Sequence, residues 1–280
     1  MVIVAMVGIQ SGASFAKELF PLVGPQGATM LRLLFAAVIL VGIWRPWRTK
    51  LTRREVGSIL VYGISLGGLN LLFYLALVRI PLGIAVALEF TGPLAVALIA
   101  SRRPRDFLWV ALAIAGIAVL LPITGTSESL DPIGVVFALG AGFCWFLYIV
   151  FGRRSGSTVH GGTATALGMA VAALTVLPFG LACSTGPLFV WSVLPIALGV
   201  AILSSIIPYS LEMVALKRLP AGTFGILMSL EPAIAALSGL LFLGEQLALL
   251  HYLGMGFIVI ASIGSTLDST ERSCTTTPSS

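Results

Sequence analysis

Two glutamates lie inside long apolar stretches of the chain, each with a proline close behind it. Pro93 follows Glu89 by one helical turn, and Pro232 follows Glu231 directly. A proline inside a helix cannot donate a hydrogen bond to the carbonyl four residues before it, so each stretch frees a main-chain carbonyl close to its acid. A carboxylate next to a free carbonyl suits the binding of an ammonium group or of a proton. Glu89 and Glu231 are therefore the candidate residues for substrate binding and for proton coupling.

These two stretches are related by an internal repeat, because residues 79–97 and 218–236 align without a gap. Identical positions in the two copies include Arg79 and Arg218, Pro81 and Pro220, Gly83 and Gly222, Leu88 and Leu227, and Pro93 and Pro232. The acids are not equivalent, since Glu89 aligns with Met228 and Glu231 aligns with Gly92. The proline therefore occupies the same position in both copies, whereas the acid lies about one helical turn earlier in the first copy than in the second. The two acids are therefore separate candidates for any coupling role.

The composition is that of a membrane protein. Of the 280 residues, 58% are hydrophobic and only 10% are charged, whereas a soluble domain carries about 25% charged residues. Such a chain could not cover a soluble surface, so its environment is the lipid bilayer. The net charge of +5 fits basic cytoplasmic loops better than a nucleic-acid partner. The three cysteines are isolated, so we expect no disulfide framework, no metal site and no cofactor.

Ten apolar segments are long enough to cross a hydrocarbon core, which needs roughly 20 residues of helix. They are residues 2–22, 28–44, 56–78, 82–101, 107–123, 132–152, 162–182, 191–216, 221–243 and 249–267. The segments are continuously apolar and do not alternate, which excludes a β-barrel. We therefore expect an all-α integral membrane protein with ten transmembrane helices, followed by a disordered cytoplasmic tail over residues 268–280.

The basic residues orient these spans. Most of the 16 lysines and arginines lie in the loops after the second, fourth, sixth and eighth spans, so these loops and both termini are expected on the cytoplasmic side. With five spans in each half, residues 1–127 and residues 128–267 form two repeats of opposite orientation. Inverted five-helix repeats place a substrate site near the middle of the membrane, where the halves meet.

Both acids are expected deep in the membrane. Glu89 lies roughly 10 Å from the outer end of its span, and Glu231 lies roughly 15 Å inside its own span. A charge at the bilayer centre costs roughly 2.5–3.5 kcal/mol and usually faces a cavity or a partner. The alternative is that each acid pairs with a neighbouring helix and only fixes the packing.

Polar side chains on two further spans could complete such a site. The spans at 56–78 and 191–216 each carry a polar stripe, and each directly precedes an acid-bearing span. From these stripes we take as candidate substrate ligands Asn70, Tyr74, Ser205, Tyr209 and Glu212, with Pro208 as a helix kink. Small and polar residues also form ordinary seams between helices, and this alternative stays open.

Two basic residues lie next to the same region. Lys17 ends the first span and Arg32 begins the second, so both are expected near the outer level of the membrane. Snorkelling or a loop ion pair would explain them as well as a function would, and the same holds for Glu212 near the inner end of its span. Arg32 is the better candidate for binding a substrate carboxylate, because its guanidinium can donate two parallel hydrogen bonds.

No constellation of residues predicts catalysis. The run from Gly63 to Gly67 matches the G-x-S-x-G nucleophile elbow, but that elbow requires a turn between a strand and a helix with a base nearby. Here the run lies inside an apolar helical pattern, and the histidines, His160 and His251, flank loops. The protein is therefore not expected to be an enzyme.

Several stretches resemble a known family. They are the run from Ser65 to Leu98, the run from Pro208 to Pro220, and Leu230-Glu231-Pro232 with the later Gly244-Glu245. Together with the ten spans, they are similar to the EamA family of the drug/metabolite transporter superfamily over nearly the whole chain. One departure from the family pattern is that the first half has Arg105-Asp106 where the second half has Gly244-Glu245.

The resemblance implies a secondary transporter of the bacterial inner membrane that exports small amino acids such as threonine and homoserine, in exchange for protons. Its central site would be lined by the third, fourth, eighth and ninth spans, among others. Glu89 or Glu231 would hold the ammonium group of the substrate and release it when protonated from the outer side.

Two alternatives to this function remain. One is a transporter of the same fold for another cargo, such as a purine or a cationic drug, and the other is a non-transporting membrane subunit. A phosphate-bearing cargo would need several buried basic residues, and the sequence offers at most Lys17 and Arg32. The oligomeric state is left open.

Overall fold

The computed structural model describes residues 2–99, 104–120, 130–158, 161–208, 211, 230–245 and 247–275. Nearly all of these residues lie in helices, and none of them forms a strand. The predicted all-α class is therefore confirmed. The number of ten spans and their division into two inverted repeats stay predictions, since parts of the segments 191–216 and 221–243 lie outside the described residues.

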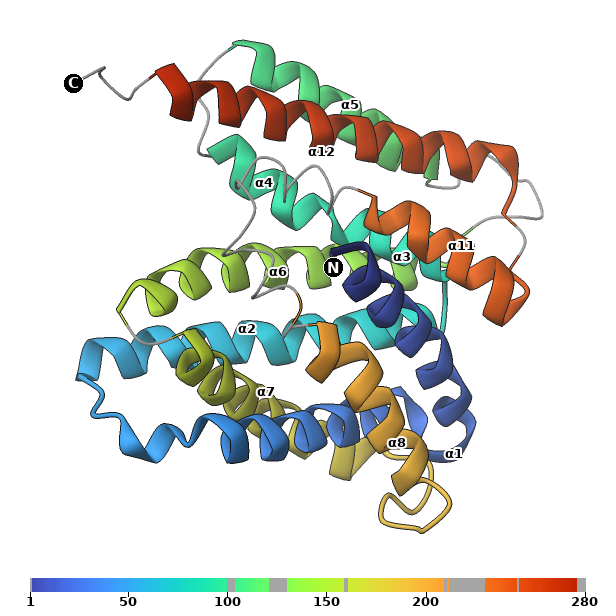
Figure 1. The fold of residues 1–280 in the computed structure, drawn as a ribbon. Helices are drawn as coiled ribbons and strands as arrows, with labels where there is room; N and C mark the ends of the chain where they lie inside the picture. The colour runs from blue at the N-terminus through green and yellow to red at the C-terminus, as the bar shows by residue number, and fades with distance from the viewer. Residues whose placement is uncertain are drawn as a thin grey trace.

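The first two predicted spans are joined in one long helical element. α1 (Val2–Trp44) contains Gly24 in a non-helical conformation, with φ 74° and ψ 165°. Pro25 pushes the residue before it out of the helical region, and a glycine accepts a positive φ without a Cβ clash. α1 therefore bends sharply at Gly24, and its two arms run in different directions (Figure 1).

α2 (Arg53–Leu77) follows the short 3-10 helix η1 (Pro46–Arg48). It begins with a capping box, in which the Thr52 hydroxyl accepts from the Glu55 N–H and the Glu55 carboxylate accepts from the Thr52 N–H. Two N–H groups that have no partner inside the helix are satisfied in this way, which fixes where α2 starts.

The acid-bearing segment of the first half is divided into two short helices. α3 (Leu82–Glu89) ends at the acid, and α4 (Thr91–Ile99) starts after Phe90. Pro93 cannot donate to the Glu89 carbonyl, which removes a hydrogen bond that one continuous helix would need at this point. Every residue of α3 is buried, so this short helix lies at the centre of the molecule.

The remaining helices complete the bundle. They are α5 (Pro104–Leu120), α6 (Pro132–Thr158), α7 (Gly161–Cys183), α8 (Leu194–Ala201) with the π-helix η2 (Ile202–Ile206), α11 (Glu231–Leu243) and α12 (Leu249–Thr275). Within the described ranges, four helices are long and apolar enough to cross a membrane, namely α1, α2, α6 and α7. The chain is therefore a multi-pass membrane protein.

The C-terminal tail differs from the prediction. Disorder is expected from the sequence over residues 268–280, but α12 continues as a helix to Thr275. No glycine or proline lies between Ser265 and Thr275, so neither of the two residues that most disfavour a helix interior stops the helix there. The prediction of disorder is wrong for residues 268–275, and residues 276–280 lie outside the described part.

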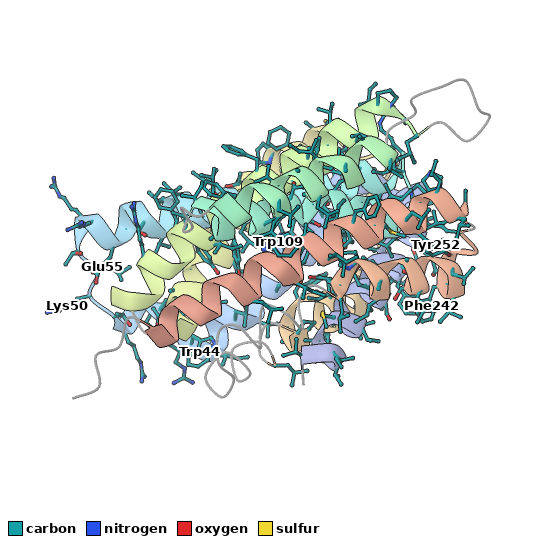
Figure 2. All side chains as sticks on the ribbon, turned by 90° about the horizontal axis from the view of Figure 1, so that it is seen from above. Trp44, Lys50, Glu55, Trp109, Phe242 and Tyr252 are labelled. Carbon is teal, nitrogen blue, oxygen red and sulfur yellow. The ribbon has the colours of Figure 1, made fainter. Side chains whose placement is uncertain are left out.

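The long helices surround α3. In Figure 1, α5 and α12 lie along one side, α3, α4 and α11 lie next to them, and α2, α6 and α7 lie beyond. Large apolar side chains cover the outside, for example Trp191, which is 87% exposed. This pattern suits faces that contact lipid. Figure 2 shows Lys50 and Glu55 at one end of the helices and Phe242 and Tyr252 at the opposite end.

An ion pair joins the two halves of the chain outside the helices. Arg79, in the loop between α2 and α3, donates from Nη1 to Oδ2 of Asp131 at 2.6 Å. Asp131 also accepts from the N–H of Ile133, in the first turn of α6, at 2.8 Å. The hydrogen bond from Arg79, followed by that from Ile133, holds the pKa of Asp131 below its usual value. Arg79, the first position of the internal repeat, thus ties the start of α3 to the start of α6.

Small residues allow the central helices to cross closely. A Cβ added at Gly142 of α6 would lie 2.8 Å from the carbonyl oxygen of Glu89, and one added at Gly83 of α3 would lie 2.7 Å from Cα of Ala236 in α11. A change of side-chain rotamer could not relieve these contacts, because both neighbours are backbone atoms. Close approach of this kind supplies the van der Waals packing that joins helices in lipid. α3 is held in this way between α6 and α11.

We expect Gly142→Ala to destabilise the fold by about 1–3 kcal/mol, because overpacking would push α6 away from the Glu89 carbonyl. Gly256→Ala in α12 is the matched control, since nothing lies within 4 Å of the Cβ added there. Alanine should stabilise that helix slightly. Thermal unfolding in detergent, followed by tryptophan fluorescence, measures both variants, and equal midpoints would contradict the proposed crossing.

Candidate functional site

The structure buries both predicted acids and places them in one region. Glu89 is 7% exposed at the end of α3, and Glu231 is 5% exposed at the start of α11. These two helices pack against each other. Glu89 lies within electrostatic range of both Glu231 and Arg32. Two carboxyl groups and one guanidinium group therefore share the interior of the molecule.

An amide from the first arm of α1 binds Glu231. Gln10 donates from Nε2 to Oε1 of Glu231 at 3.0 Å, and Gln10 itself is 2% exposed. Gln10 is not among the residues predicted from the sequence, although it is the one amide side chain in the apolar stretch 2–22. A buried amide is a signal of the same kind as a buried acid, because each needs a hydrogen-bond partner.

Arg32 is buried inside the protein. It is 5% exposed and donates from Nη1 to Oγ of Ser204 at 3.1 Å and from Nη2 to Oδ1 of Asn70. Its guanidinium also lies over the ring of Tyr74, 4.8 Å from the centroid. The snorkelling explanation is therefore wrong for Arg32, because after the bend at Gly24 its side chain is bound to α2 and η2.

The partners of Arg32 are oriented by bonds to their own helices. Asn70 donates from Nδ2 to the Leu66 carbonyl at 2.7 Å, and the Ser204 hydroxyl donates to the Val200 carbonyl at 2.7 Å. Each side chain therefore presents its oxygen to the guanidinium. Asn70 and Tyr74 were both predicted for this site, and the serine that contacts Arg32 is the neighbour of the predicted Ser205.

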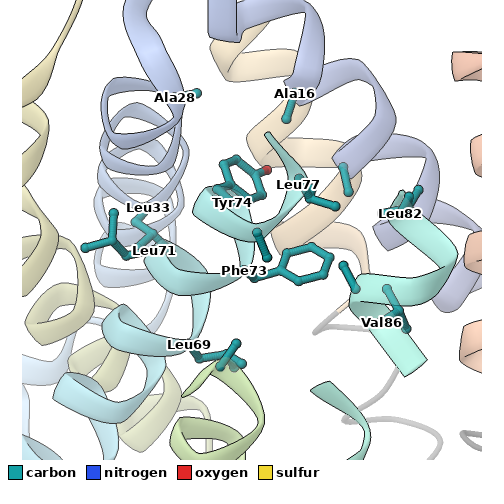
Figure 3. Close-up of a cluster of buried hydrophobic side chains, with 14 of the residues drawn as sticks. Ala16, Ala28, Leu33, Leu69, Leu71, Phe73, Tyr74, Leu77, Leu82 and Val86 are labelled. Atoms are coloured by element: carbon teal, nitrogen blue, oxygen red, sulfur yellow. The ribbon is translucent and has the colours of Figure 1, made fainter. Parts of the chain in front are cut away.

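Three buried polar atoms of this site have no hydrogen-bond partner within the described part of the chain: Nε of Arg32, the hydroxyl of Tyr74 and Oγ of Ser205. Tyr74 is completely buried, and its ring packs against Phe20 of α1 with the centroids 5.5 Å apart. Figure 3 shows the ring and its hydroxyl among buried apolar side chains. Buried polar groups are usually hydrogen-bonded, so these atoms have capacity left for a polar ligand.

The freed carbonyl of Glu89 is covered by helix packing. It faces Gly142 of α6 at the close crossing described above. The neighbouring Leu88 carbonyl accepts from the Thr91 hydroxyl at 2.7 Å. The expected arrangement of an open carbonyl beside the Glu89 carboxylate is therefore not seen, and the carboxylate is the group of Glu89 that can meet a ligand.

Other predicted residues are described only in part. Tyr209 and Glu212 lie outside the described residues, and their roles stay predictions. Pro208 is buried, and the chain before it is wound as the π-helix η2. A proline cannot donate to the carbonyl four residues before it, and π-helical turns are frequent at functional sites. Pro232 is buried in the first turn of α11, but its predicted bend cannot be described because residues 212–229 lie outside the described part.

A second charged cluster joins three helices. Lys17 of α1 donates from Nζ to Oε1 of Glu245 at 2.7 Å, and Oε2 of Glu245 accepts from the N–H of Leu82 at the start of α3 at 2.8 Å. Glu245 reaches this position because Gly244 ends α11 with φ 64°, a conformation that glycine adopts without strain. One carboxylate therefore holds α1, α11 and the end of α3 opposite Glu89. An ion pair is one of the three explanations that the sequence leaves open for Lys17, beside snorkelling and a function.

A solved structure shares the fold of this chain. It is a crystal structure of a protein that is 21% identical in sequence, and it superposes with a TM-score of 0.61 over 96% of this chain and 98% of its own. At this level of identity the likeness concerns the fold alone. The helical arrangement described above is therefore one that also occurs in an experimentally determined protein.

Sequence comparisons identify relatives of this chain. Residues 132–267 match the EamA-like transporter family. The threonine/homoserine exporter RhtA of Escherichia coli strain K12 is 53% identical over 267 residues, which are 95% of this chain and 90% of the exporter. The threonine/homoserine exporter RhtA of Salmonella typhimurium strain LT2 is 52% identical over the same shares of the two chains.

We expect Lys17→Met to destabilise the fold by roughly 1.5–3 kcal/mol, because it leaves the Glu245 carboxylate without its cation. Adding Glu245→Gln should recover part of this loss, since a neutral amide can still accept from the Leu82 N–H. Thermal unfolding of the wild type, the two single variants and the double variant measures the coupling between the two side chains. Purely additive effects would show that this ion pair does not hold the helices together.

Proposed function

Because the chain belongs to the EamA-like transporter family, we propose that it exports small amino acids such as threonine and homoserine from the cytoplasm across the bacterial inner membrane. The observation that carries this proposal is its 53% identity to the threonine/homoserine exporter of Escherichia coli over 95% of the chain. The chain is a transporter and not an enzyme, so its polar residues are considered as ligands and proton carriers.

A zwitterionic amino acid needs both signs of charge in its site, and the buried cluster has both. The carboxylates of Glu89 and Glu231 would hold the ammonium group, and Arg32 would bind the carboxylate of the substrate. In the structure each terminal nitrogen of Arg32 donates one of its two N–H groups, to Ser204 from Nη1 and to Asn70 from Nη2. Its Nε has no partner among the described residues, so this N–H is a donor for an incoming carboxylate. The electrostatic coupling of Arg32 with Glu89 supports a single site for both ends of the substrate.

Threonine and homoserine also carry a hydroxyl group, and two candidates could bind it. The hydroxyls of Tyr74 and Ser205 are buried without a partner in the described residues. A site that is built to hydrogen-bond a substrate hydroxyl rejects an analogue that lacks it, because the buried groups of the site are then left unpaired. Tyr74 and Ser205 would therefore favour hydroxylated amino acids over apolar ones of the same shape.

Proton exchange would use the same two acids. Glu89 and Glu231 interact electrostatically, and interacting acids titrate as a pair. A proton and the ammonium group of the substrate would then compete for this pair. Substrate bound from the cytoplasm would be released when a proton enters from the outer side, which gives antiport without a second ion site. Tyr209 and Glu212 remain candidate ligands in this mechanism.

The proposed topology has ten spans in two inverted repeats, residues 1–127 and residues 128–267, with both termini in the cytoplasm. The arrangement in Figure 2 supports it, because Lys50, in the most basic loop, and Phe242, at the end of α11, lie at opposite ends of the helices. With the Lys50 end in the cytoplasm, the cluster of Lys17 and Glu245 lies toward the outer end.

Other cargoes suit the described charges less well. A phosphate-bearing substrate would need several buried cations, but Lys17 is already paired with Glu245, which leaves Arg32. A cationic drug would meet Glu89 and Glu231, but it would also be repelled by Arg32 close by. A purine has no ammonium group for the acids to bind.

The test of the function is uptake and exchange of labelled threonine in proteoliposomes that contain only the purified protein. We expect homoserine and threonine to compete for transport, and nucleosides and cationic drugs to have no effect. Transport by the purified protein alone separates a transporter from a non-transporting subunit, and competition by a nucleoside or a drug in place of homoserine would contradict the assigned cargo.

We expect Glu89→Gln and Glu231→Gln each to lower proton-driven threonine transport by about 10- to 100-fold. Each removes a charge-assisted contact worth roughly 1.5–3 kcal/mol to the ammonium group. Glu18→Gln is the matched control, because it makes the same change at a glutamate of α1 that is exposed. The mechanism is wrong if both variants of the buried acids keep the normal rate and its dependence on pH.

We expect Tyr74→Phe to reduce the preference for threonine over valine by about fivefold, because one hydrogen bond to the substrate hydroxyl is worth about 1 kcal/mol. Valine has the shape of threonine without the hydroxyl, so the ratio of the two transport efficiencies isolates this contact. Ser205→Ala provides the second measurement. An unchanged ratio in both variants would show that neither hydroxyl selects the substrate.

A further inference from the structure

We propose that Gln10 is a positioning residue for Glu231, whose side-chain amide pairs with this acid in both of its protonation states. The inference rests on the proposed function, in which Glu231 exchanges a proton in each cycle. Gln10 lies outside the residues that would contact the substrate hydroxyl or carboxylate. Its role is to keep one buried acid hydrogen-bonded while the charge of that acid changes.

The contact itself is short and buried. Nε2 of Gln10 lies 3.0 Å from Oε1 of Glu231, and the two residues are 2% and 5% exposed. The Ser14 hydroxyl donates to the main-chain carbonyl of Gln10 at 3.0 Å, which ties this residue to the next turn of α1. Away from water a hydrogen bond is electrostatically stronger, and the loss of one is more costly. The balance between the ionised and the protonated form of Glu231 therefore depends on its hydrogen bond with Gln10.

The packing of α1 directs Gln10 toward α11. A Cβ added at Gly12 would lie 2.5 Å from Cβ of Ser204, and one added at Gly8 would lie 3.0 Å from the Leu203 carbonyl oxygen. These glycines bring one face of α1 against η2. Residues two positions apart lie about 200° apart around a helix, so Gln10 points away from η2, to the side where α11 begins.

An amide suits an acid that changes its charge. An ionised carboxylate only accepts hydrogen bonds, whereas a protonated carboxyl group also donates one. The Gln10 side chain has a donor in Nε2 and an acceptor in Oε1. Its terminal torsion has two broad orientations roughly half a turn apart, so the amide can present either atom to Glu231.

The acceptor of this amide is available for the second orientation. Oε1 of Gln10 is buried and has no hydrogen-bond partner within the described residues. A half-turn of the amide would therefore break no other bond of this oxygen, and it would offer the oxygen to the O–H of a protonated Glu231. An aliphatic side chain at position 10 could form a hydrogen bond with neither the ionised nor the protonated form of Glu231.

The charged and titratable groups around Glu231 come from the elements that pack against α11. Among the described side chains they are Lys17, Glu18 and Arg32 on α1, Glu89 on α3, Glu245 after α11, and His251 and Tyr252 on α12. Lys17 and Glu245 form an ion pair, and Glu18 and Tyr252 are exposed. Glu89, Arg32 and His251 are therefore the groups that must stay unchanged when the pH dependence assigned to Gln10 is tested.

The test is the pH profile of threonine exchange by Gln10→Met in proteoliposomes. Methionine keeps the length of the side chain and removes both the donor and the acceptor. Both forms of Glu231 then lose the hydrogen bond with Gln10, and the ionised form loses the stronger one, so we expect the midpoint of the profile to rise by about one pH unit. Ser14→Ala is the matched control, because among the described residues this hydroxyl donates to the main-chain carbonyl of Gln10 and not to its side-chain amide, and the midpoint of this variant should stay that of the wild type.

Gln10→Glu is the second variant, since it keeps the shape of the side chain and adds a second titrating group next to Glu231. We expect its pH profile to broaden into two steps, as interacting acids do. A Gln10→Met profile identical to that of the wild type overturns the proposal. If Gln10→Met fails to fold, a Gln10→Glu profile that is not broadened overturns it equally.

Failure of the proposed function would look different. If the wild type exchanges no threonine, the export proposal fails. The role of Gln10 is then tested by a measurement that does not depend on transport. Infrared spectroscopy follows the band of the protonated carboxyl group of Glu231 against pH, and Glu231→Gln assigns the band. A band that titrates at a higher pH in Gln10→Met supports the role of Gln10, and a band that titrates as in the wild type overturns it.

Discussion

Buried charges need partners on neighbouring helices, because a lone charge inside a bilayer is costly. In this protein Arg32 is bound by Asn70 and Ser204, and Glu231 is bound by Gln10. Each of these contacts joins segments far apart in the chain. Lipid is as apolar as the helix surfaces, so the hydrophobic effect supplies little force between helices. The polar contacts therefore do much to determine which helices lie together at the centre.

The short helix α3 shows how packing and charge act on the same element. Its glycine face crosses α11 closely, its carboxyl end lies against α6, and its first N–H is held by the Glu245 carboxylate. The break at Phe90 separates it from α4, so contacts at its own two ends determine where it lies. The position of Glu89 therefore depends on residues that would never touch a substrate, including Lys17 and Gly142.

The same arrangement accounts for the proposed transport of a zwitterion. Glu89 lies within electrostatic range of Glu231 and of Arg32, and the site holds buried polar atoms with unused hydrogen-bonding capacity. Such a site can bind both ends of an amino acid and can exchange its ammonium group for a proton. The similarity to threonine/homoserine exporters agrees with this charge distribution.

The membrane class, the helical fold and most residues of the candidate site could be predicted from the sequence, because an acid, an amide or an arginine inside an apolar run is conspicuous. The burial of Arg32 between Asn70 and Ser204, the covering of the Glu89 carbonyl and the pairing of Gln10 with Glu231 could not be predicted. Those features depend on the direction that the chain takes after Gly24 and on how closely glycine faces cross. Contacts between distant helices leave no periodic pattern along the chain, so only the tertiary structure decided which of the buried polar side chains meet.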